Sequence, residues 1–174
     1  MNYNTFMKQM DKIIKDLEAE FRSYSVELGD DLTKELTIEV QVLGQTSLLM
    51  DNVIPSKISL TRTNDLDALV KGRSLELVIF RKVLKSNGLV LDELSSDIWI
   101  PKGASFVPYY DSSAVKVSYL DPISALVSKA VKAKEKNRVL ISDALVVLGE
   151  SLASKIRSNG GDIGYFTESQ KRSL

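Results

Sequence analysis

Two carboxylates have the spacing in this sequence that most directly suggests chemistry. Asp65 and Asp67 lie two positions apart in TNDLDALV, residues 63–70. If this segment is extended, both side chains project from one face, with their roots about 6 to 7 Å apart. Such a pair can bind divalent cations, and Mg²⁺ or Mn²⁺ held in this way supports two-metal phosphoryl transfer. Two solvated aspartates on a polar strand face would show the same spacing.

A glycine turn before these acids is a candidate phosphate-binding element. Gly44, Gln45, Thr46 and Ser47 follow the β-rich run LTIEVQVL at 36–43 and precede an apolar stretch. A strand-to-helix turn of this kind exposes backbone N–H groups at the positive end of a helix dipole, and its hydroxyl groups can reach phosphate oxygens. An ordinary turn in which Thr46 or Ser47 caps the helix is the alternative. The order of turn, helix and acidic strand favours phosphate binding.

The composition excludes several classes of function. Lys and Arg together number 23, as do Asp and Glu, so the formal net charge is zero and no global field attracts nucleic acid or an anionic membrane. Without cysteine or histidine, the chain cannot form disulfides, zinc ribbons, thiol nucleophiles or Ser-His-Asp triads. The sequence has no apolar signal core and no apolar run of about 18 residues. We therefore expect a cytoplasmic protein that binds neither membranes nor zinc.

The elements that position these groups follow from the hydrophobic periodicity. In the first half, helical and alternating patterns occur in turn. They predict a helix from Asn4 or Thr5 to Phe21, a strand at 36–43, a short helix at 48–54, a strand at 63–70, and a helix at 74–86 that is capped by Ser74 and ended by Asn87-Gly88.

In the second half, four short strands are expected before two helices. The strands are predicted at 90–91, 97–101, 106–110 and 114–120. Asp121-Pro122 predicts a helix start, because a capping carboxylate precedes a proline in the first turn. A single last helix is predicted over about 139–157, with Asn159-Gly160-Gly161 as its stop.

This arrangement predicts a mixed α/β or α+β fold, in which helices cover a small sheet. We expect one domain over residues 1–174, with a core at about 36–120 and a helical part at about 121–158.

Three blocks of the chain together resemble a known family. They are the strand-G-x-x-S turn with its helix, the strand TRTNDLDALV, and the stretch YLDPISALVSKAVKAKEKNRVLISDAL, within about residues 37–148. This pattern is similar to the minimal nucleotidyltransferases, and most closely to bacterial MNT and AbiEii-like proteins and a neighbouring uncharacterised group. The acidic strand is moderately specific, and the spacing of the blocks is the stronger signal.

The resemblance implies a role for each matching residue. The turn of Gly44, Gln45, Thr46 and Ser47 would hold a triphosphate, with Gly44 and Ser47 as its cradle. Asp65 and Asp67 would bind Mg²⁺ or Mn²⁺. Arg62 or Thr63 would brace the acidic strand, and Lys129 would lie near the nucleotide phosphates. Each basic or hydroxyl group has a plainer alternative: Arg62 as a surface ion pair, Thr63 as a β-former and Lys129 as a solvated helix lysine.

The sequence also departs from the family pattern. Gln45 stands where a second glycine is frequent, and Asn137 stands in the place of a final aspartate. A third carboxylate on a neighbouring strand normally acts as the base. Asp97 is the best substitute, with Asp92 and Asp111 as further candidates.

Aromatic side chains near the middle of the chain suggest a second feature of nucleotide binding. Tyr109, Tyr110, Phe106 and Trp99 could stack on a base or serve as core anchors.

The resemblance implies a magnesium-dependent enzyme that transfers a nucleoside monophosphate from an NTP to a hydroxyl of RNA, protein or a small molecule. It further implies a toxin–antitoxin or phage-defence component with an antitoxin partner. The alternative is a catalytically inactive module that binds nucleotide or protein. An acidic group from another strand close to Asp65 and Asp67 would favour the enzyme.

Overall fold

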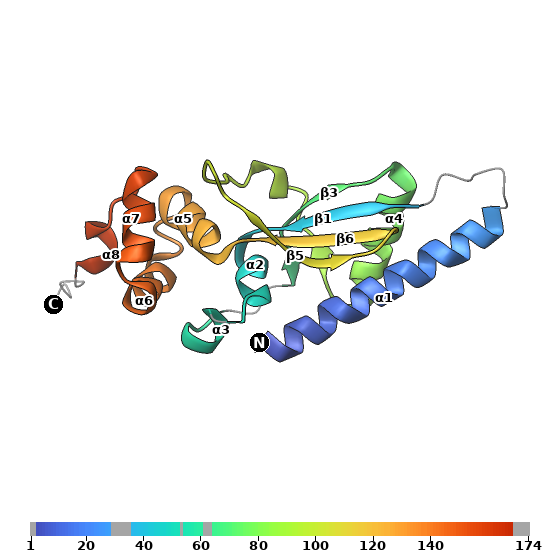
Figure 1. The fold of residues 1–174 in the computed structure, drawn as a ribbon, viewed down its shortest axis with the longest axis horizontal. Coiled ribbons are helices and arrows are strands. Elements are labelled where there is room, and N and C mark those ends of the chain that lie inside the picture. The colour runs from blue at the N-terminus through green and yellow to red at the C-terminus, as the bar shows by residue number, and fades with distance from the viewer. Residues whose placement is uncertain (1–2, 29–35, 53, 61–63, 169–174) are drawn as a thin grey trace.

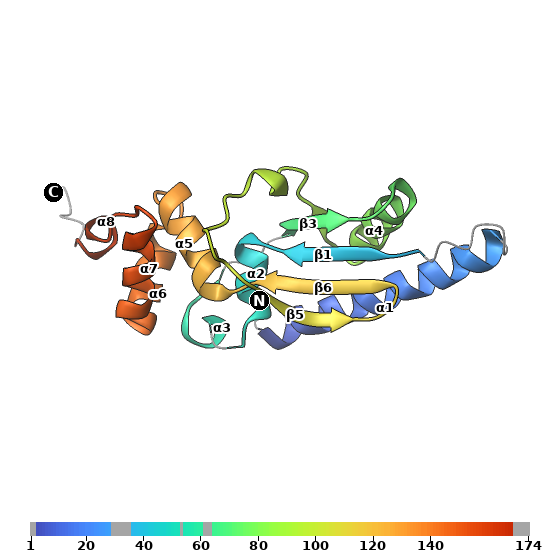
Figure 2. The ribbon, with the colours of Figure 1, turned by 45° about the horizontal axis from the view of Figure 1, so that its top comes forward.

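The computed structural model describes residues 3–28, 36–52, 54–60 and 64–168. A four-stranded sheet lies at its centre (Figures 1 and 2), with the strand order β3 (Ala68–Lys71), β1 (Ile38–Val42), β6 (Val115–Leu120) and β5 (Phe106–Asp111). β1 is antiparallel to β3 and parallel to β6, while β5 and β6 form an antiparallel hairpin. The predicted mixed α/β fold with a small sheet is confirmed.

The first helix packs along one face of this sheet. α1 (Tyr3–Leu28) contacts α2 (Gly44–Met50), α4 (Ser74–Ser86) and β6, so the three helices share that face (Figure 2). The apolar side chains that predicted α1 are all buried: Phe6, Met10, Ile13, Ile14, Leu17 and Phe21. The prediction is confirmed, and the helix continues beyond Phe21 to Leu28.

The predicted strand at 63–70 divides in two at Asp67. β2 (Asp65–Leu66) pairs in parallel with β4 (Val90–Leu91), whereas β3 pairs with β1. At the division the N–H of Leu43 donates to the carbonyl of Asp67 at 2.8 Å. The chain therefore changes its pairing partner at Asp67, which places this residue at the junction of the two sheets.

The connection from β4 to β5 contains no strand, so the predicted strand at 97–101 is wrong. A 3₁₀ turn, Ser95–Asp97, occupies part of it. Asp92 starts this turn by accepting the N–H of Leu94 at 2.9 Å through its side chain. Local hydrogen bonds of this kind compete with strand pairing.

Four helices follow the sheet: α5 (Pro122–Lys132), α6 (Arg138–Leu148), α7 (Glu150–Ser158) and α8 (Gly164–Thr167). Asp121 caps α5 as predicted, because its carboxylate accepts the N–H of Ser124 at 2.9 Å. The single helix expected over 139–157 is wrong. Gly149 interrupts it with φ 54° and ψ −136°, a conformation that is accessible chiefly to glycine.

α3 (Ile54–Lys57) follows α2 as a single turn. Ser74 is the first residue of α4 and not its cap, which is Arg73. Among the described helices, none is both long enough and apolar enough to cross a membrane.

Candidate functional site

β1 and β6 end on the side of the sheet that faces the C-terminal helices (Figures 1 and 2). Side chains from this region line a cleft. It consists of two adjoining cavities of about 520 and 590 Å³, a size suited to a small-molecule ligand. The residues that border both cavities are Asp67, Asp92, Lys129, Lys136 and Asn137. Asp67, a predicted metal ligand, and Lys129, a predicted phosphate-binding residue, therefore border both parts of the cleft.

Strand alternation places the two predicted metal ligands. Leu66 and Ala68 enter the core, while Asp65 is exposed and Asp67 is partly exposed. Asp65 borders the 590 Å³ cavity together with Asp67. The predicted same-face arrangement is thus present at the edge of the cleft.

Gly44 makes room for Asp67. Gly44 has φ +58°, and a Cβ atom built on it would lie only 1.9 Å from Oδ2 of Asp67. The N–H of Gln45 hydrogen-bonds the same carboxylate. The carboxylate of Asp67 consequently occupies the turn at the start of α2, where the sequence suggested a bound phosphate.

Neither hydroxyl of this turn points into the cleft. Thr46 and Ser47 are buried. The hydroxyl of Thr46 donates to the carbonyl of Asp65 at 3.4 Å, and that of Ser47 donates to the carbonyl of Gly44 at 2.9 Å. The Thr46 hydroxyl therefore joins the start of α2 to β2, and the Ser47 hydroxyl stabilises the turn itself. The predicted bracing residues, Arg62 and Thr63, lie outside the described residues.

Asp67 and Lys129 modify each other's protonation. Burial raises the pKa of Asp67, and the charges of Asp92 and Asp65 raise it further, although Lys129 and the Gln45 N–H act in the opposite direction. Burial lowers the pKa of Lys129, as does the nearby Lys136, while Asp67 opposes this change. The cleft thus brings an acidic cluster against a pair of lysines.

Asp92 is a third carboxylate, which borders both cavities, and its charge acts on Asp67. The N–H of Asp92 donates to the carbonyl of Leu66 at 3.0 Å, so Asp92 continues from β4 directly beside the acidic segment. Asp97, the preferred candidate from sequence, is exposed and borders only the 520 Å³ cavity. Asp111 lies at the far end of β5 and pairs with Lys116 at 3.4 Å. Parallel pairing of β2 with β4 is the signal that favours Asp92.

These acids do not form a preformed metal cage. Within the described ranges, no group of three or more carboxylate, histidine or cysteine side chains is placed to hold a metal ion. The cleft is lined by separate acids, Asp65, Asp67, Asp92, Asp97 and Asp143.

The basic side of the cleft is formed by α5 and the turn after it. Lys129 and Lys132 lie on α5, and Lys136 follows it. Asn137 is buried, and its amide donates to the carbonyl of Ala133 at 2.8 Å. This hydrogen bond stabilises the turn between α5 and α6, and Asn137 also borders both cavities.

The aromatic residues fall into two groups. Tyr109 donates its hydroxyl to Asp11, and Tyr110 donates to Glu18 at 2.8 Å, so both hold α1 against β5. Phe106 packs against the core. Trp99 also packs against the core, but it borders the cleft as well, and the centroid of its ring lies 5.5 Å from the ammonium of Lys132.

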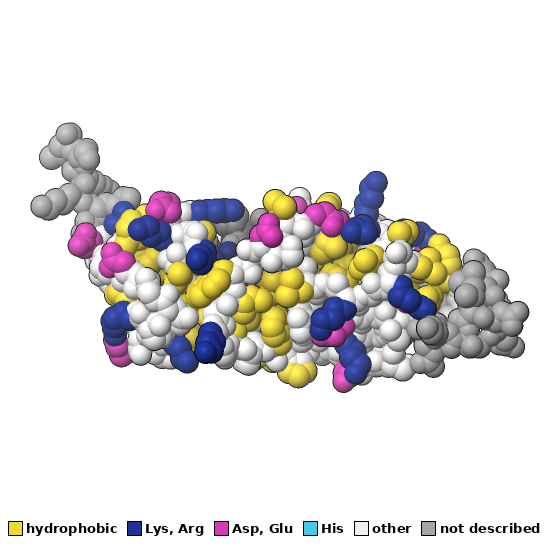
Figure 3. All heavy atoms as spheres, turned by 90° about the horizontal axis from the view of Figure 1, so that it is seen from above, with side chains coloured by type: hydrophobic (Ala, Val, Ile, Leu, Met, Phe, Trp, Pro, Cys, Tyr) yellow, Lys and Arg dark blue, Asp and Glu magenta, His cyan; other side chains and the backbone are white. Residues whose placement is uncertain are grey.

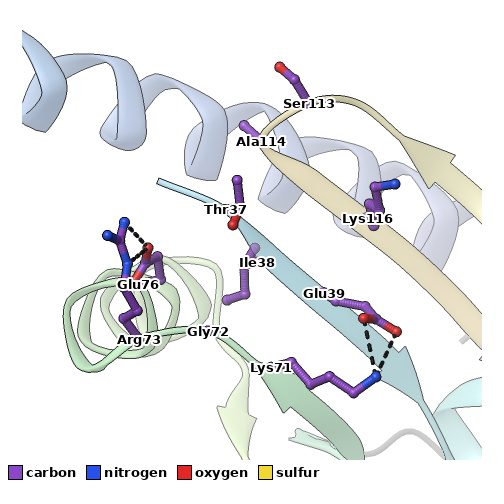
Figure 4. A pocket seen from close by; sticks show the side chains of 10 residues that line it. All are labelled: Thr37, Ile38, Glu39, Lys71, Gly72, Arg73, Glu76, Ser113, Ala114 and Lys116. Atoms are coloured by element: carbon purple, nitrogen blue, oxygen red, sulfur yellow. Dashed lines mark hydrogen bonds and ion pairs between the residues drawn. The ribbon is translucent and has the colours of Figure 1, made fainter. Parts of the chain in front are cut away.

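A separate cavity of about 740 Å³ lies at the opposite end of β1 (Figure 4). Its charges neutralise one another: Lys71 pairs with Glu39 at 3.2 Å, and Arg73 pairs with the fully buried Glu76. Burial raises the pKa of Glu76, but the Arg73 hydrogen bond and backbone N–H groups outweigh this and lower it. The pairing leaves this cavity less suited to a charged ligand than the cleft.

Charge on the molecular surface is mixed. Figure 3 shows basic and acidic side chains interspersed on one face, with apolar side chains gathered near its middle. A charged ligand would therefore be bound by a local group of side chains and not attracted by the overall charge of the protein, which is zero.

Comparisons with family models, with curated proteins and with solved structures gave no match. The likeness to minimal nucleotidyltransferases consequently rests on the sequence blocks described above.

Proposed function

We propose that the protein is a magnesium-dependent nucleotidyltransferase that moves a nucleoside monophosphate from an NTP to a hydroxyl group. The observation that carries this proposal is the convergence of Asp65, Asp67, Asp92 and Lys129 on one cleft, although they come from separate segments. Acids beside lysines suit a ligand that combines a divalent cation with phosphates.

The donor set fits Mg²⁺. This ion is commonly held by one or two carboxylates together with substrate phosphates and water, so a cage of three acids is not required. Asp65 and Asp67 would supply the carboxylates. Burial raises the pKa of Asp67, and the negative charges of Asp92 and Asp65 raise it further, so a bound cation would stabilise the ionised group. When bound, Mg²⁺ would neutralise developing charge on the phosphate oxygens.

The lysines would hold the phosphates. Lys129 and Lys136 border both cavities and lie opposite the acids. The turn at Gly44 has a different role in this proposal, because Asp67 already fills it. The turn orients the metal-binding carboxylate, and the triphosphate lies on the lysine side.

Asp92 is the better candidate for the general base. A base must come within hydrogen-bonding reach of the acceptor hydroxyl to take its proton. Asp92 borders both cavities, whereas Asp97 borders one. The class of acceptor (RNA, protein or small molecule) and an antitoxin partner in a toxin–antitoxin or phage-defence pair are implied by the family resemblance alone.

A nucleotide-binding module without catalysis is the second candidate. It is favoured by the lack of a preformed group of three metal ligands among the described residues, and by the hydrogen bond that already engages Asp67. Such a module would bind Mg²⁺ and NTP in the same cleft without transferring the nucleotide.

Thermal unfolding tests the binding part of the proposal. A ligand at 100 times its Kd stabilises the native state by about 2.7 kcal/mol, which corresponds to a rise of roughly 5 to 10 °C in Tm for a chain of this size. We expect Mg²⁺ with NTP to give this rise, and the double variant Asp65→Asn with Asp67→Asn to abolish it. Asp111→Asn is the matched control and should retain it. A full rise in the double variant would show that the metal site is assigned wrongly.

Transfer of label from α-³²P-labelled NTPs to a cell extract separates the two candidates. The enzyme predicts label on an acceptor, and Asp92→Asn should reduce the rate by about 10² to 10⁴ without removing the Tm rise. Asp97→Asn should have little effect. A Tm rise without label transfer under any NTP would favour the module, and loss of transfer in Asp97→Asn alone would reverse the assignment of the base.

A further inference from the structure

The two cavities of the cleft differ in character. The 590 Å³ cavity is bordered by Asp65, Gln45, Ser59 and other polar groups. The 520 Å³ cavity has the more apolar lining, to which Ile98, Trp99, Leu120, Ala125 and Ala133 contribute beside charged groups. Trp99 supplies the one large flat side chain of the cleft.

Trp99 is held in place from α5. The buried hydroxyl of Ser128 donates to the carbonyl of Trp99, which fixes this part of the connection on the helix. One turn further along α5, the ammonium of Lys132 lies 5.5 Å from the centroid of the indole ring. The ring itself remains partly exposed at the border of the cleft. An anchored, partly exposed indole is suited to stacking.

We propose that the indole of Trp99 is the platform on which the base of the nucleotide stacks. This inference rests on the proposed function, because it assumes that the ligand of the cleft is a nucleotide. The base would lie against Trp99 and its apolar neighbours, and the phosphates would extend to Lys129 and Lys136. Lys129 precedes Lys132 by three residues, which is about 4.5 Å along a helix axis, so the two parts of the ligand meet adjacent parts of α5.

The other aromatic candidates do not provide this platform. Tyr109 and Tyr110 use their hydroxyl groups to bind α1. The cation of Lys132 lies over the indole, so a base that stacks there would displace it, and the displaced ammonium would approach a phosphate of the bound nucleotide. Stacking is tolerant of base identity, because every base has a π-face, so we expect purine and pyrimidine nucleotides to bind.

Trp99 is the only tryptophan in the sequence, so the intrinsic tryptophan fluorescence reports on this position alone. We would titrate the full chain with ATP, CTP or inorganic tripolyphosphate, each with Mg²⁺, and record both Trp emission and Tm. The nucleotides should change the emission and raise Tm. Tripolyphosphate should raise Tm with a much smaller change in emission, because it has no base.

Variants at Trp99 provide the second measurement. Trp99→Ala should weaken ATP binding about 10- to 100-fold, Trp99→Phe should restore most of it, and neither should change the affinity for tripolyphosphate. The unchanged tripolyphosphate affinity shows that the variant is folded. Tyr110→Phe, a matched aromatic control outside the cleft, should leave all these affinities unchanged.

The outcomes distinguish this inference from the proposed function. If ATP raises Tm in a manner that depends on Asp65 and Asp67, but neither the emission nor the Trp99→Ala affinity changes, the platform is assigned wrongly and nucleotide binding stands. If no nucleotide affects Tm or emission, the proposed function fails and the platform fails with it.

Discussion

At the scale of single residues, the central feature is the close approach of Asp67 to Gly44. The carboxylate of Asp67 accepts a hydrogen bond from the N–H of Gln45. It can lie there only because Gly44 has no Cβ atom. Gly44 also has φ +58°, where other residues are strained. A glycine that looked like part of a phosphate cradle therefore serves to orient an acid.

Gly44→Ala should consequently have two costs. The left-handed backbone costs about 1 to 2 kcal/mol, and the contact with Asp67 adds to it. Gly88→Ala is the matched control, because Gly88 has φ +75° and a Cβ at this position would meet no atom within 4 Å. Urea unfolding of both variants should show the larger loss of stability for Gly44→Ala. Equal losses would mean that the approach of Asp67 has no energetic consequence.

Residue types on periodic segments are the easier part to predict from sequence. Asp65 and Asp67 can be paired because alternation in a strand fixes their common face, and Lys129 follows from its place on α5. From sequence, Asp92 is a weaker candidate for the third carboxylate than Asp97. It follows a strand of only two residues, Val90–Leu91, whose pairing carries almost no sequence signal. Ser47 is predicted to hold a phosphate, but its hydroxyl donates to the carbonyl of Gly44. A backbone carbonyl accepts such a hydrogen bond as readily as a phosphate does.

At the scale of elements, the start of α5 determines where the lysines of the cleft lie. Asp121 accepts the N–H of Ser124 at 2.9 Å and that of Ser105 at 3.1 Å. It therefore joins the cap of the helix to the connection that carries Trp99. Burial raises the pKa of Asp121, but these hydrogen bonds from Ser124 and Ser105 outweigh it and lower the pKa below its ordinary value.

This lowered pKa gives a pH-dependent prediction. Because the folded state binds the proton less tightly than the unfolded chain does, the stabilisation is present above about pH 4 and is lost as pH falls through the native pKa. Asp121→Ala should reduce the free energy of unfolding by about 1 kcal/mol at pH 7, and the difference from wild type should shrink in acid. Urea unfolding across pH checks this.

Asp121→Asn separates the cap from its charge. Asparagine is an equally good cap, so this variant should lose less stability than Asp121→Ala and should not show the acid-dependent decrease in stability that comes from Asp121. A gap between Asp121→Ala and wild type that is as large at pH 3 as at pH 7 would contradict the charged cap.

Most elements are predictable because long periodic patterns identify them, and the failures have local causes. All six apolar side chains that predicted α1 are buried. The segment 97–101 has strand-forming residues, but the turn at Asp92 and Ser95 prevents pairing. Gly149 lies inside a strong helical pattern, and only its backbone conformation reveals the break between α6 and α7.

At the scale of the whole molecule, α1 closes the core from one side of the sheet. Its contacts with α4, α2 and β6 join the N-terminus to later parts of the chain. Lys82 on α4 also pairs with Glu20 at 2.9 Å. An exposed pair of this kind adds little, so the buried side chains of α1 supply most of its stabilisation.

Leu17→Ala tests the contribution of this helix. Leu17 is 1% exposed, and its truncation should reduce the free energy of unfolding by about 2 to 5 kcal/mol. Val26→Ala is the matched control, since Val26 lies on the same helix, is 83% exposed and should change stability by less than about 0.5 kcal/mol. Calorimetry or urea unfolding measures both. Similar small losses would indicate that α1 is dispensable for the core.

The cleft is a property of the entire fold. Asp67 and Lys129 meet because β3, antiparallel to β1, begins at the edge where β1 and β6 end, and α5 follows β6. Asp92 joins them because β4 pairs with β2. Sequence spacing can suggest each of these three residues, but it cannot give the distances between their side chains. The turn at Gly44 is an example, because sequence spacing suggests that it holds a phosphate, whereas the fold places the carboxylate of Asp67 there.

β5, one of the two edge strands of the four-stranded sheet, has a consequence for how copies of the protein behave at high concentration. Its pairing with β6 shifts register between Pro108 and Tyr110, and a proline has no N–H to offer an incoming chain. An irregular rim of this kind is a poor template for edge-to-edge polymerisation. The sheet is thereby protected on this side from growing into a fibril.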